Sequence, residues 1–334
     1  MMQHVTDFLF IPQFVAVPLY VSMNYFDESL LHSHLVSPMP GFTPGILHES
    51  SSVSNWPDRT LFREHSPYGS ANRKYFLSLL RKLQLTEEQL VSNGFPRWKS
   101  SQRTNVVVKP SLFDIIAGRV EFVPDNGMKI HPCCGRPRGV AGCQYSESHV
   151  TDTMRESLLS DFYATPEPTG PSDPRSETFY ALDCEFVYTT WGKEPARITL
   201  VDEFGAHVID CVFRTEHELV DPNTQYSGLT TEEVECNDLS LEDVRELLFE
   251  KVNSQTVLIG HALENDLKAL RIVHDTIVDT RSNIEGRLFK RSLKSLAREK
   301  LAVEIQSEDG GHDSGEDAWA AMQLVVRAVE TLGW

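Results

Sequence analysis

The second half of the chain alternates short apolar runs with amphipathic stretches, and this pattern predicts its secondary structure. Three consecutive apolar runs of strand length are joined by hairpin-like connections. Beyond them, apolar positions at helical spacing alternate with further short apolar runs. The predicted elements are strands over 179–188, 196–201, 207–213, 256–260 and 276–278 and helices over 239–252, 264–273, 292–301 and 314–331. A three-stranded meander followed by alternating helix and strand predicts a mixed α/β sheet that is covered by helices on its faces.

The first half of the chain has a weaker pattern. Residues 27–72 are rich in Ser, Pro, His and Gly and show little periodicity, which predicts irregular or disordered chain. Helical spacing follows over 75–83, and Thr86 with Gln89 makes a capping-box pattern that begins a second short helix. Four prolines lie between 164 and 178, a composition typical of an extended linker. The predicted organisation is an irregular segment 1–72, a small helical region with a Cys/His-rich part over 73–163, a linker over 164–178 and the sheet domain over 179–334.

Composition narrows the class of protein. The formal net charge is −17, from 31 Lys and Arg against 48 Asp and Glu, which argues against a generally basic surface for nucleic acid. A phosphate-binding protein this acidic must gather positive charge locally or use metal ions. Six cysteines without the spacing of a disulfide scaffold indicate a reducing compartment. Pro12 and Pro18 interrupt the uncharged stretch 8–26, and no basic residue precedes it, so neither a secretory signal nor a membrane span is expected.

Two acids lie two residues apart on the first predicted strand of the sheet domain. Asp183 and Glu185 therefore leave the same face of that strand, and their apolar neighbours indicate partial burial. Two buried carboxylates side by side repel each other and cost several kcal/mol unless a cation neutralises them. A divalent metal ion would do so. The alternative is a polar pair at a strand end that Thr or Arg side chains satisfy.

Two further acids lie at the predicted starts of helices. Asp266 follows the strand over 256–260, and Asp317 follows the glycine-rich loop over 310–315. Either acid alone could serve only to complement a helix dipole or to form a cap. His312 stands in the same loop, just ahead of Asp317, on a glycine hinge. A mobile imidazole beside a metal site is suited to take a proton from attacking water.

A cluster of Cys and His residues in the first half suggests a separate metal site. Cys133, Cys134, Cys143 and His149 could complete one tetrahedral structural zinc site, which would hold a small loop-rich module together. Their spacing is not that of a standard zinc finger. The alternative is that the cysteines are free thiols, and the sequence leaves the choice open.

Basic and aromatic residues near the acids are candidate substrate contacts. Lys290, Arg291 and Lys294 fall on neighbouring faces of a predicted helix, where they could contact phosphates or form an ordinary solvated face. Phe186, next to the first acidic pair, could stack on a terminal base or pack in the core.

Taken in order, the acidic segments resemble the three exonuclease motifs of the DEDDh 3′-to-5′ exonucleases. Asp183 and Glu185 stand in the first motif, Asp266 in the second, and His312 with Asp317 in the third. The chain resembles the Rex-type RNA exonucleases of eukaryotes more closely, especially the RNA exonuclease 1 group. The likeness covers about 150 residues from Phe179, through the segments 180–185, 226–230, 258–266, 278–280 and 290–296, and extends weakly upstream through 85–90 and 133–150.

The resemblance implies a ribonuclease H-like fold and the release of nucleoside 5′-monophosphates from the 3′ ends of single-stranded RNA. It implies two Mg²⁺ or Mn²⁺ ions, with Asp183, Glu185 and Asp317 binding one of them and Asp183 the second. Asp266 would act directly or through water, and His312 would be the general base. It further implies RNA processing or turnover in the nucleus or nucleolus; protein partners are not indicated. The resemblance would also imply further Cys and His residues before Cys133, but this chain has the segment 113–119 there instead. Whether zinc binds is therefore left undecided.

Two other functions fit the same sequence. An exonuclease of this fold could act on DNA, because no residue identifies a contact to a 2′-hydroxyl. A non-catalytic nucleic-acid-binding scaffold could retain the fold, although a complete set of acids with the histidine argues against it.

Overall fold

The computed structural model describes residues 70–108, 156–283, 291–306 and 311–332. These residues all fall in one compact unit, Asn55–Trp334. The four predicted zinc ligands Cys133, Cys134, Cys143 and His149 lie outside the described residues, as do Lys290 and all but the last three residues of the predicted irregular segment 1–72. Among the described helices, none has the length and apolar character needed to cross a membrane.

A mixed sheet forms the centre of this unit, as the sequence predicts. Its strands follow the order β10-β8-β4-β5-β6, and β7 also pairs with β4. The meander β4-β5-β6 is antiparallel, whereas β8 runs parallel to β4 and to β10. The strands are β4 Phe179–Thr189, β5 Gly192–Val201, β6 His207–Val212, β7 Leu219–Asp221, β8 Val257–Gly260 and β10 Ile277–Asp279. Short pairs outside it are β1 Arg97–Trp98 with β2 Val106–Val107 and β3 Tyr163–Ala164 with β9 Ile272–Val273.

Most helices begin at residues whose side chains cap them. Thr86, Thr230 and Ser240 each form a complete capping box, including the one predicted at Thr86. The α-helices are α2 Ser70–Leu80, α3 Glu87–Asn93, α5 Thr224–Ser227, α6 Thr231–Glu235, α7 Leu241–Lys251, α8 Glu264–Ala269, α9 Thr280–Asn283, α10 Leu293–Leu296 and α11 Ser314–Thr331. Short 3₁₀ turns cover Arg81–Leu83, Glu156–Ser160 and Pro174–Glu177, and a π-helical turn, Ala297–Leu301, follows α10.

One predicted helix is too long. The pattern over 264–273 predicts helix throughout, but α8 ends at Ala269 and residues 272–273 form β9. The reason is local, because Arg271 adopts a left-handed backbone conformation with φ of 55°. The chain therefore turns sharply after α8 and pairs with β3, which helical periodicity does not reveal.

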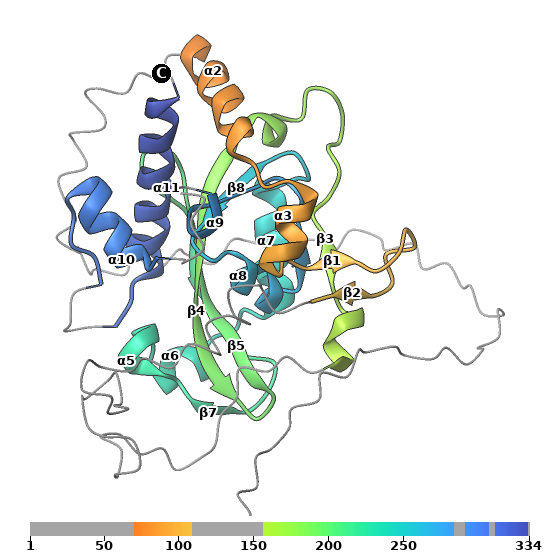
Figure 1. Ribbon diagram of the computed structural model, residues 1–334. Coiled ribbons are helices and arrows are strands. Elements are labelled where there is room, and N and C mark those ends of the chain that lie inside the picture. The colour runs from red at the N-terminus through yellow and green to blue at the C-terminus, as the bar shows by residue number, and fades with distance from the viewer. Residues whose placement is uncertain (1–69, 109–155, 284–290, 307–310, 333–334) are drawn as a thin grey trace, which may run out of the picture. The chain divides into compact units, whose positions relative to one another are not determined.

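The two faces of β4 contact different helices. Phe179 and Ala181 pack with α11 and α2 on one face, whereas Leu182 and Cys184 belong to the cluster that includes α7 and α8 on the other. Figure 1 shows α11 along one side of β4 and α7 and α8 on the other. Side chains alternate between the faces of a strand, so residues 183 and 185 belong to the face that carries α11.

The proline-rich segment 164–178 lies against the sheet domain. Thr165 is buried and its hydroxyl pairs with His274 Nδ1 at 2.9 Å. Ser254 donates its N–H to the carbonyl oxygen of Pro166. Farther along, the Arg175 guanidinium donates to the carbonyl oxygen of Phe249 at the end of α7. The segment is therefore attached over most of its length, and the division into separate domains at this point stays a prediction.

Candidate active site

An opening in the edge of β4 creates the site. Strand β8 pairs with β4 only as far as Ala181, and β7 begins to pair at Tyr188. Among the described strands, none covers that edge of β4 between these points. There the N–H of Cys184 donates to Asp266 Oδ1 at 3.1 Å. A carboxylate from α8 thus takes the place of a neighbouring strand and brings Asp266 against the strand that carries Asp183 and Glu185.

The turn from β8 into α8 depends on a glycine. A Cβ on Gly260 would lie 2.8 Å from the side chain of Leu263 and 3.2 Å from the carbonyl oxygen of Leu182, so no larger residue fits without displacement. Asp279 then fixes the start of α8, because its Oδ2 accepts the N–H of Leu263 at 2.9 Å. The close packing at Gly260 and the hydrogen bond from Leu263 to Asp279 together set the start of α8, and with it the position of Asp266.

The four predicted carboxyl groups converge. Burial raises the pKa of Asp183 well above its ordinary value, and the charges of Asp266, Asp317 and Glu185 raise it further. Glu185 follows the same pattern: burial, then the charge of Asp317, raises its pKa to about 9. The pKa of Asp317 rises to about 7, chiefly through burial. Repulsion of this kind requires the carboxyl groups to be near one another in a poorly hydrated place.

Two oxygens of this cluster fit a bound cation. Glu185 Oε1 and Asp317 Oδ1 are buried and accept no hydrogen bond. Carboxylate oxygens left unsatisfied in a protein interior are costly, and they are the ligands that Mg²⁺ and Mn²⁺ prefer. Within the described residues, no three or more Asp, Glu, His or Cys side chains stand in the arrangement of a closed metal site. The unsatisfied oxygens and the mutual repulsion of the carboxyl groups are the features that a bound cation would relieve.

The alternative of a satisfied polar pair does not hold for Glu185. The positive charge of Arg197 does act on Glu185 and partly offsets the rise in its pKa. The guanidinium, however, makes its hydrogen bonds to Asp210, at 2.9 and 3.0 Å, and Glu185 Oε1 stays unsatisfied. A bulge in β5 lies at this point, since Glu185 pairs with Arg197 but Phe186 pairs with Pro195.

His312 lies beside the acids. Its Nδ1 is 3.7 Å from Asp317 Oδ2, and its side chain is 41% exposed. Burial, and then the charge of Lys294, lowers the pKa of His312, which favours the neutral imidazole that can accept a proton.

Gly311 and His312 are held in place by their neighbours. The N–H of His312 donates to the carbonyl oxygen of Tyr226 at 2.6 Å. A Cβ on Gly311, where φ is 79°, would lie 2.7 Å from the backbone nitrogen of Gly228. The sequence predicts a glycine hinge, but Gly311 instead allows close contact with the turn at 224–228. Tyr226 also sets its half-exposed ring edge-on to the imidazole, with centroids 6.2 Å apart.

Gln306 is a site residue that the sequence does not identify. Its side-chain Nε2 donates to Asp317 Oδ2 at 2.7 Å, and its backbone N–H donates to Glu316. Lys294 Nζ in turn donates to the carbonyl oxygen of Gln306 at 2.7 Å. No motif marks Gln306, because its hydrogen bond to Asp317 joins two residues that are not neighbours in the sequence.

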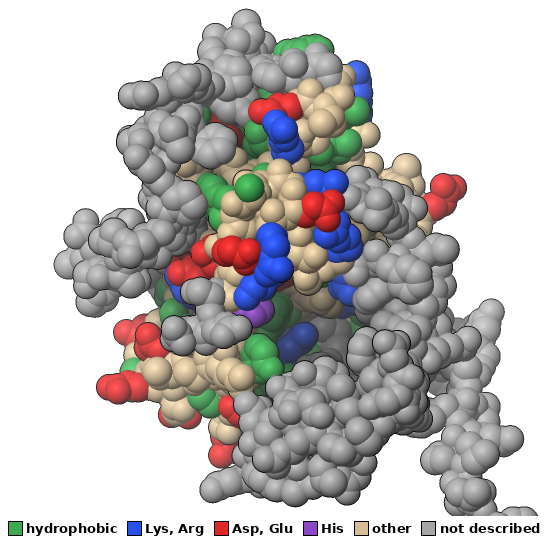
Figure 2. Space-filling model, turned by 60° about the vertical axis from the view of Figure 1, so that its left-hand side comes forward, with side chains coloured by type: hydrophobic (Ala, Val, Ile, Leu, Met, Phe, Trp, Pro, Cys, Tyr) green, Lys and Arg blue, Asp and Glu red, His purple; other side chains and the backbone are tan. Residues whose placement is uncertain are grey.

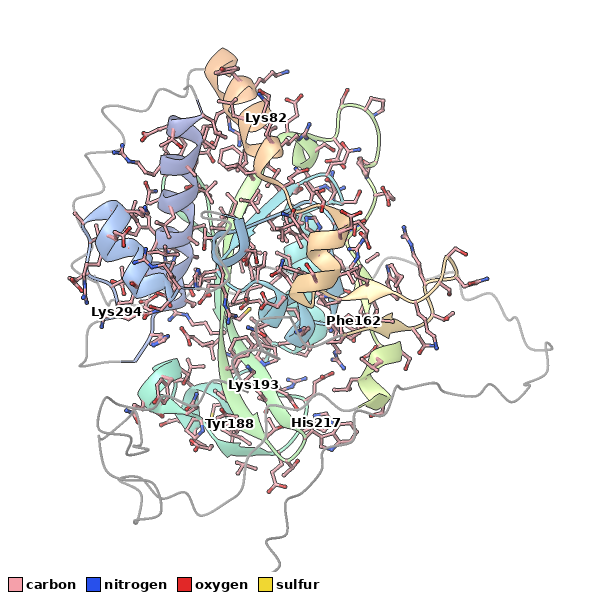
Figure 3. All side chains as sticks on the ribbon, in the orientation of Figure 1. Lys82, Phe162, Tyr188, Lys193, His217 and Lys294 are labelled. Carbon is pink, nitrogen blue, oxygen red and sulfur yellow. The ribbon has the colours of Figure 1, made fainter. Side chains whose placement is uncertain are left out.

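The residues predicted to contact the substrate differ in what lies next to them: an acid, the proposed base or the core. Lys294 lies close enough to His312 to lower its pKa. Arg291 forms an ion pair with Glu299 at 2.6 Å. Phe186 packs partly against the core cluster with the Lys193 ammonium 4.8 Å from its ring centroid. Figure 3 shows Lys294 on α10 and Lys193 on the β4–β5 hairpin, and Figure 2 shows Lys and Arg side chains interspersed with acids on one face. Their roles in binding stay predictions.

The sequences of several RNA exonucleases align with much of this chain. RNA exonuclease 3 of Candida glabrata is 33% identical over 299 residues, which cover 80% of this chain and 73% of that protein. The chain belongs to the family of Rex-type RNA exonucleases. RNA exonuclease 1 homolog of Homo sapiens is 41% identical over 199 residues, or 58% of this chain and 16% of that protein. The chain spans between 12% and 31% of the length of four relatives that it matches, and no family model matches it.

A solved structure of the Neurospora crassa Pan2 catalytic unit, with its protease and nuclease domain, also resembles the chain. It aligns with a TM-score of 0.44 and 26% sequence identity, over 51% of this chain and 30% of that one.

Proposed function

We propose that this member of the Rex-type family is a 3′-to-5′ exoribonuclease that releases nucleoside 5′-monophosphates from single-stranded RNA. The observation that carries the proposal is the convergence of four mutually repelling carboxyl groups, two of them with an unsatisfied buried oxygen, beside His312. The names of the relatives support RNA as the substrate. The family likeness and the free-thiol composition support work in the nucleus or nucleolus, in RNA processing or turnover.

Each residue of the site has a role in this proposal. Asp183, Glu185 and Asp317 would hold one Mg²⁺ or Mn²⁺ ion, and Asp183 would share the second, with Asp266 acting directly or through water. Bound divalent ions supply activation of water and stabilisation of the charge on the scissile phosphate and the leaving oxygen. His312 accepts the proton of the attacking water at Nε2, because its Nδ1 side faces Asp317. Gln306 holds the Asp317 carboxylate in one orientation.

The test uses 5′-labelled single-stranded RNA and DNA of the same sequence, with Mg²⁺, Mn²⁺ or EDTA. The expected result is a ladder on RNA that shortens from the 3′ end, requires the divalent ion and yields nucleoside 5′-monophosphates. A substrate with a blocked 3′ end controls for polarity. Equal or faster shortening of DNA would favour the DNA exonuclease, and binding without shortening would favour a non-catalytic scaffold. An unchanged rate in Asp183→Asn would overturn the proposal.

A further inference from the structure

A polar network on β5 and β6 lies beside the proposed catalytic residues and centres on Asp210. The Arg197 guanidinium donates to both carboxylate oxygens of Asp210, at 2.9 and 3.0 Å. His207 Nδ1 is 2.9 Å from Asp210 Oδ2, and the Thr199 hydroxyl donates to Oδ1 at 3.2 Å. A carboxylate can only accept, so all three side chains serve it as donors. Burial alone would raise the pKa of Asp210, but the hydrogen bonds from His207 and Arg197 lower it below its usual range.

The same network contacts the first turn of α11 at three consecutive residues. Thr199 donates to Asp210, so the Ser314 hydroxyl donates to Thr199, at 2.7 Å, and both side chains are fully buried. Arg197 lies 4.0 Å from Asp313 Oδ1. A Cβ on Gly315 would be 2.9 Å from two atoms of the His207 ring, so the helix backbone lies directly against the imidazole.

The proposed base directly precedes the cap of that first turn, and one of the proposed metal ligands lies on the turn itself. Asp313 caps α11 through the N–H groups of Gly315 and Glu316, His312 immediately precedes it, and the N–H of Asp317 donates to the carbonyl oxygen of Asp313 at 2.9 Å. The position and rotation of the turn therefore set where the His312 ring and the Asp317 carboxylate point. At its other end, the network fixes Arg197, the residue that pairs with Glu185 across the strands.

We propose that Asp210, acting through Arg197, Thr199 and His207, is a positioning residue that holds the start of α11 in register with the acids on β4. The expected loss of catalysis rests on the proposed function, whereas the attachment of α11 to Asp210 does not. Asp210 itself lies on β6, beyond β5 from the acids, and it forms hydrogen bonds with Arg197, Thr199 and His207 rather than with any of the four acids or His312. Its removal should therefore misplace catalytic groups without removing one.

The experiment compares Asp210→Asn and Thr199→Val with a matched control. Thr199→Val keeps the shape of a fully buried side chain and removes only the hydroxyl that joins Asp210 to Ser314. Asp173→Asn is the control, because Asp173 also accepts two hydrogen bonds from an arginine, Arg175, outside the site. The measurements are kcat and KM on single-stranded RNA and hydrogen exchange of the amides over 314–319, with denaturant unfolding to report folding.

Asp210→Asn is expected to lower kcat by about 10- to 100-fold with little change in KM, because small misplacements of catalytic groups are costly. Exchange over 314–319 should become faster than in the wild type, and Thr199→Val should show both effects to a smaller degree. The control should lose stability while its kcat and the exchange of α11 stay unchanged.

Two results would overturn the positioning role: a folded Asp210→Asn protein with wild-type kcat, or one whose 314–319 amides exchange as in the wild type. If Asp210→Asn does not fold, Thr199→Val decides by the same two criteria. Absence of activity in the wild type would instead refute the proposed function, and the exchange measurements would still test the attachment of α11 to Asp210.

Discussion

Asp173 and the two acids of β4 are carboxylates with opposite surroundings. Asp173, 6% exposed, accepts two hydrogen bonds from Arg175 and the N–H of Thr169, and these hold its pKa below the usual range. Asp183 and Glu185 lie in the middle of the sheet, and burial and neighbouring acids raise the pKa of each. The fold can thus provide an arginine for a buried acid, yet at the open edge of β4 it gathers acids instead.

The difference indicates where the fold gives up stability for chemistry. At Asp173 the charge and its partner come from residues two apart in the chain, so the pair completes itself locally. At β4 the partners come from α8 and α11, far along the sequence, and they bring further negative charge. A cluster of this kind becomes more stable when a bound cation relieves the repulsion, and each of the two groups of carboxylates can be tested separately.

Asp183→Asn should show the largest effect and separate stability from activity. Removing one charge from the cluster should abolish exonuclease activity, a loss of about 10³-fold or more, because the residue would hold both metal ions. In EDTA the same variant should be more stable than the wild type by about 0.5–2 kcal/mol, since repulsion is relieved. Urea unfolding and the RNA assay measure the two effects. Asp173→Asn should lose stability, and a loss of stability in both variants would contradict the comparison.

His312→Ala should lower kcat by about 10²- to 10⁴-fold, the range of a lost general base. The neutral imidazole is the active form and its pKa is lowered, so wild-type kcat/KM should fall only below pH 6.5, the ordinary pKa of histidine. Lys294→Met removes a cation that lowers this pKa, so it should move the acidic limb to higher pH. The pH profile measures both. A limb that does not move in Lys294→Met would show that Lys294 does not act on His312.

The sequence predicts the acids better than it predicts how they meet. Strand periodicity places Asp183 and Glu185 on one face of β4, because that rule needs only neighbouring residues. It cannot show that β8 stops at Gly260 and leaves the N–H of Cys184 for Asp266, which is a property of strand pairing. The same limit hides Gln306 and Arg197, whose partners lie elsewhere in the chain. The short α8 escapes prediction because one left-handed residue, Arg271, overrides a helical pattern.

His274 is a buried group whose hydrogen bonds are satisfied, as those of Asp173 are, and it gives a smaller predicted effect on stability. It is buried and neutral, with Nε2–H donating to the carbonyl oxygen of Thr256 at 2.9 Å and Nδ1 accepting from the Thr165 hydroxyl. Burial lowers its pKa from 6.5 to about 4. The unfolded chain then binds more protons between these values, so stability is full above pH 6.5 and is lost as the pH falls toward 4.

The loss at His274 should reach about 3 kcal/mol, because its pKa falls from 6.5 in the unfolded chain to about 4 in the folded protein and each pH unit between them is worth about 1.36 kcal/mol. Urea unfolding at pH 7 and pH 4.5 measures it, with His274→Gln as the variant that does not titrate. The stability difference between wild type and variant should shrink toward acid pH. A difference that stays constant would show that His274 keeps its ordinary pKa in the folded protein.

The smallest predicted effect is the stabilisation of the folded protein by a bound metal ion. It tests the acids at the edge of β4 without measuring catalysis. A ligand that binds only the folded state stabilises it by about 2.7 kcal/mol at 100 times its Kd. Mn²⁺ should therefore raise the Tm of the wild type, EDTA should reverse the rise, and Asp183→Asn should lose most of it. Asp173→Asn should keep the full increment despite its lower Tm, because its missing charge belongs to a pair that needs no cation. Equal increments in both variants would place the bound metal away from the edge of β4.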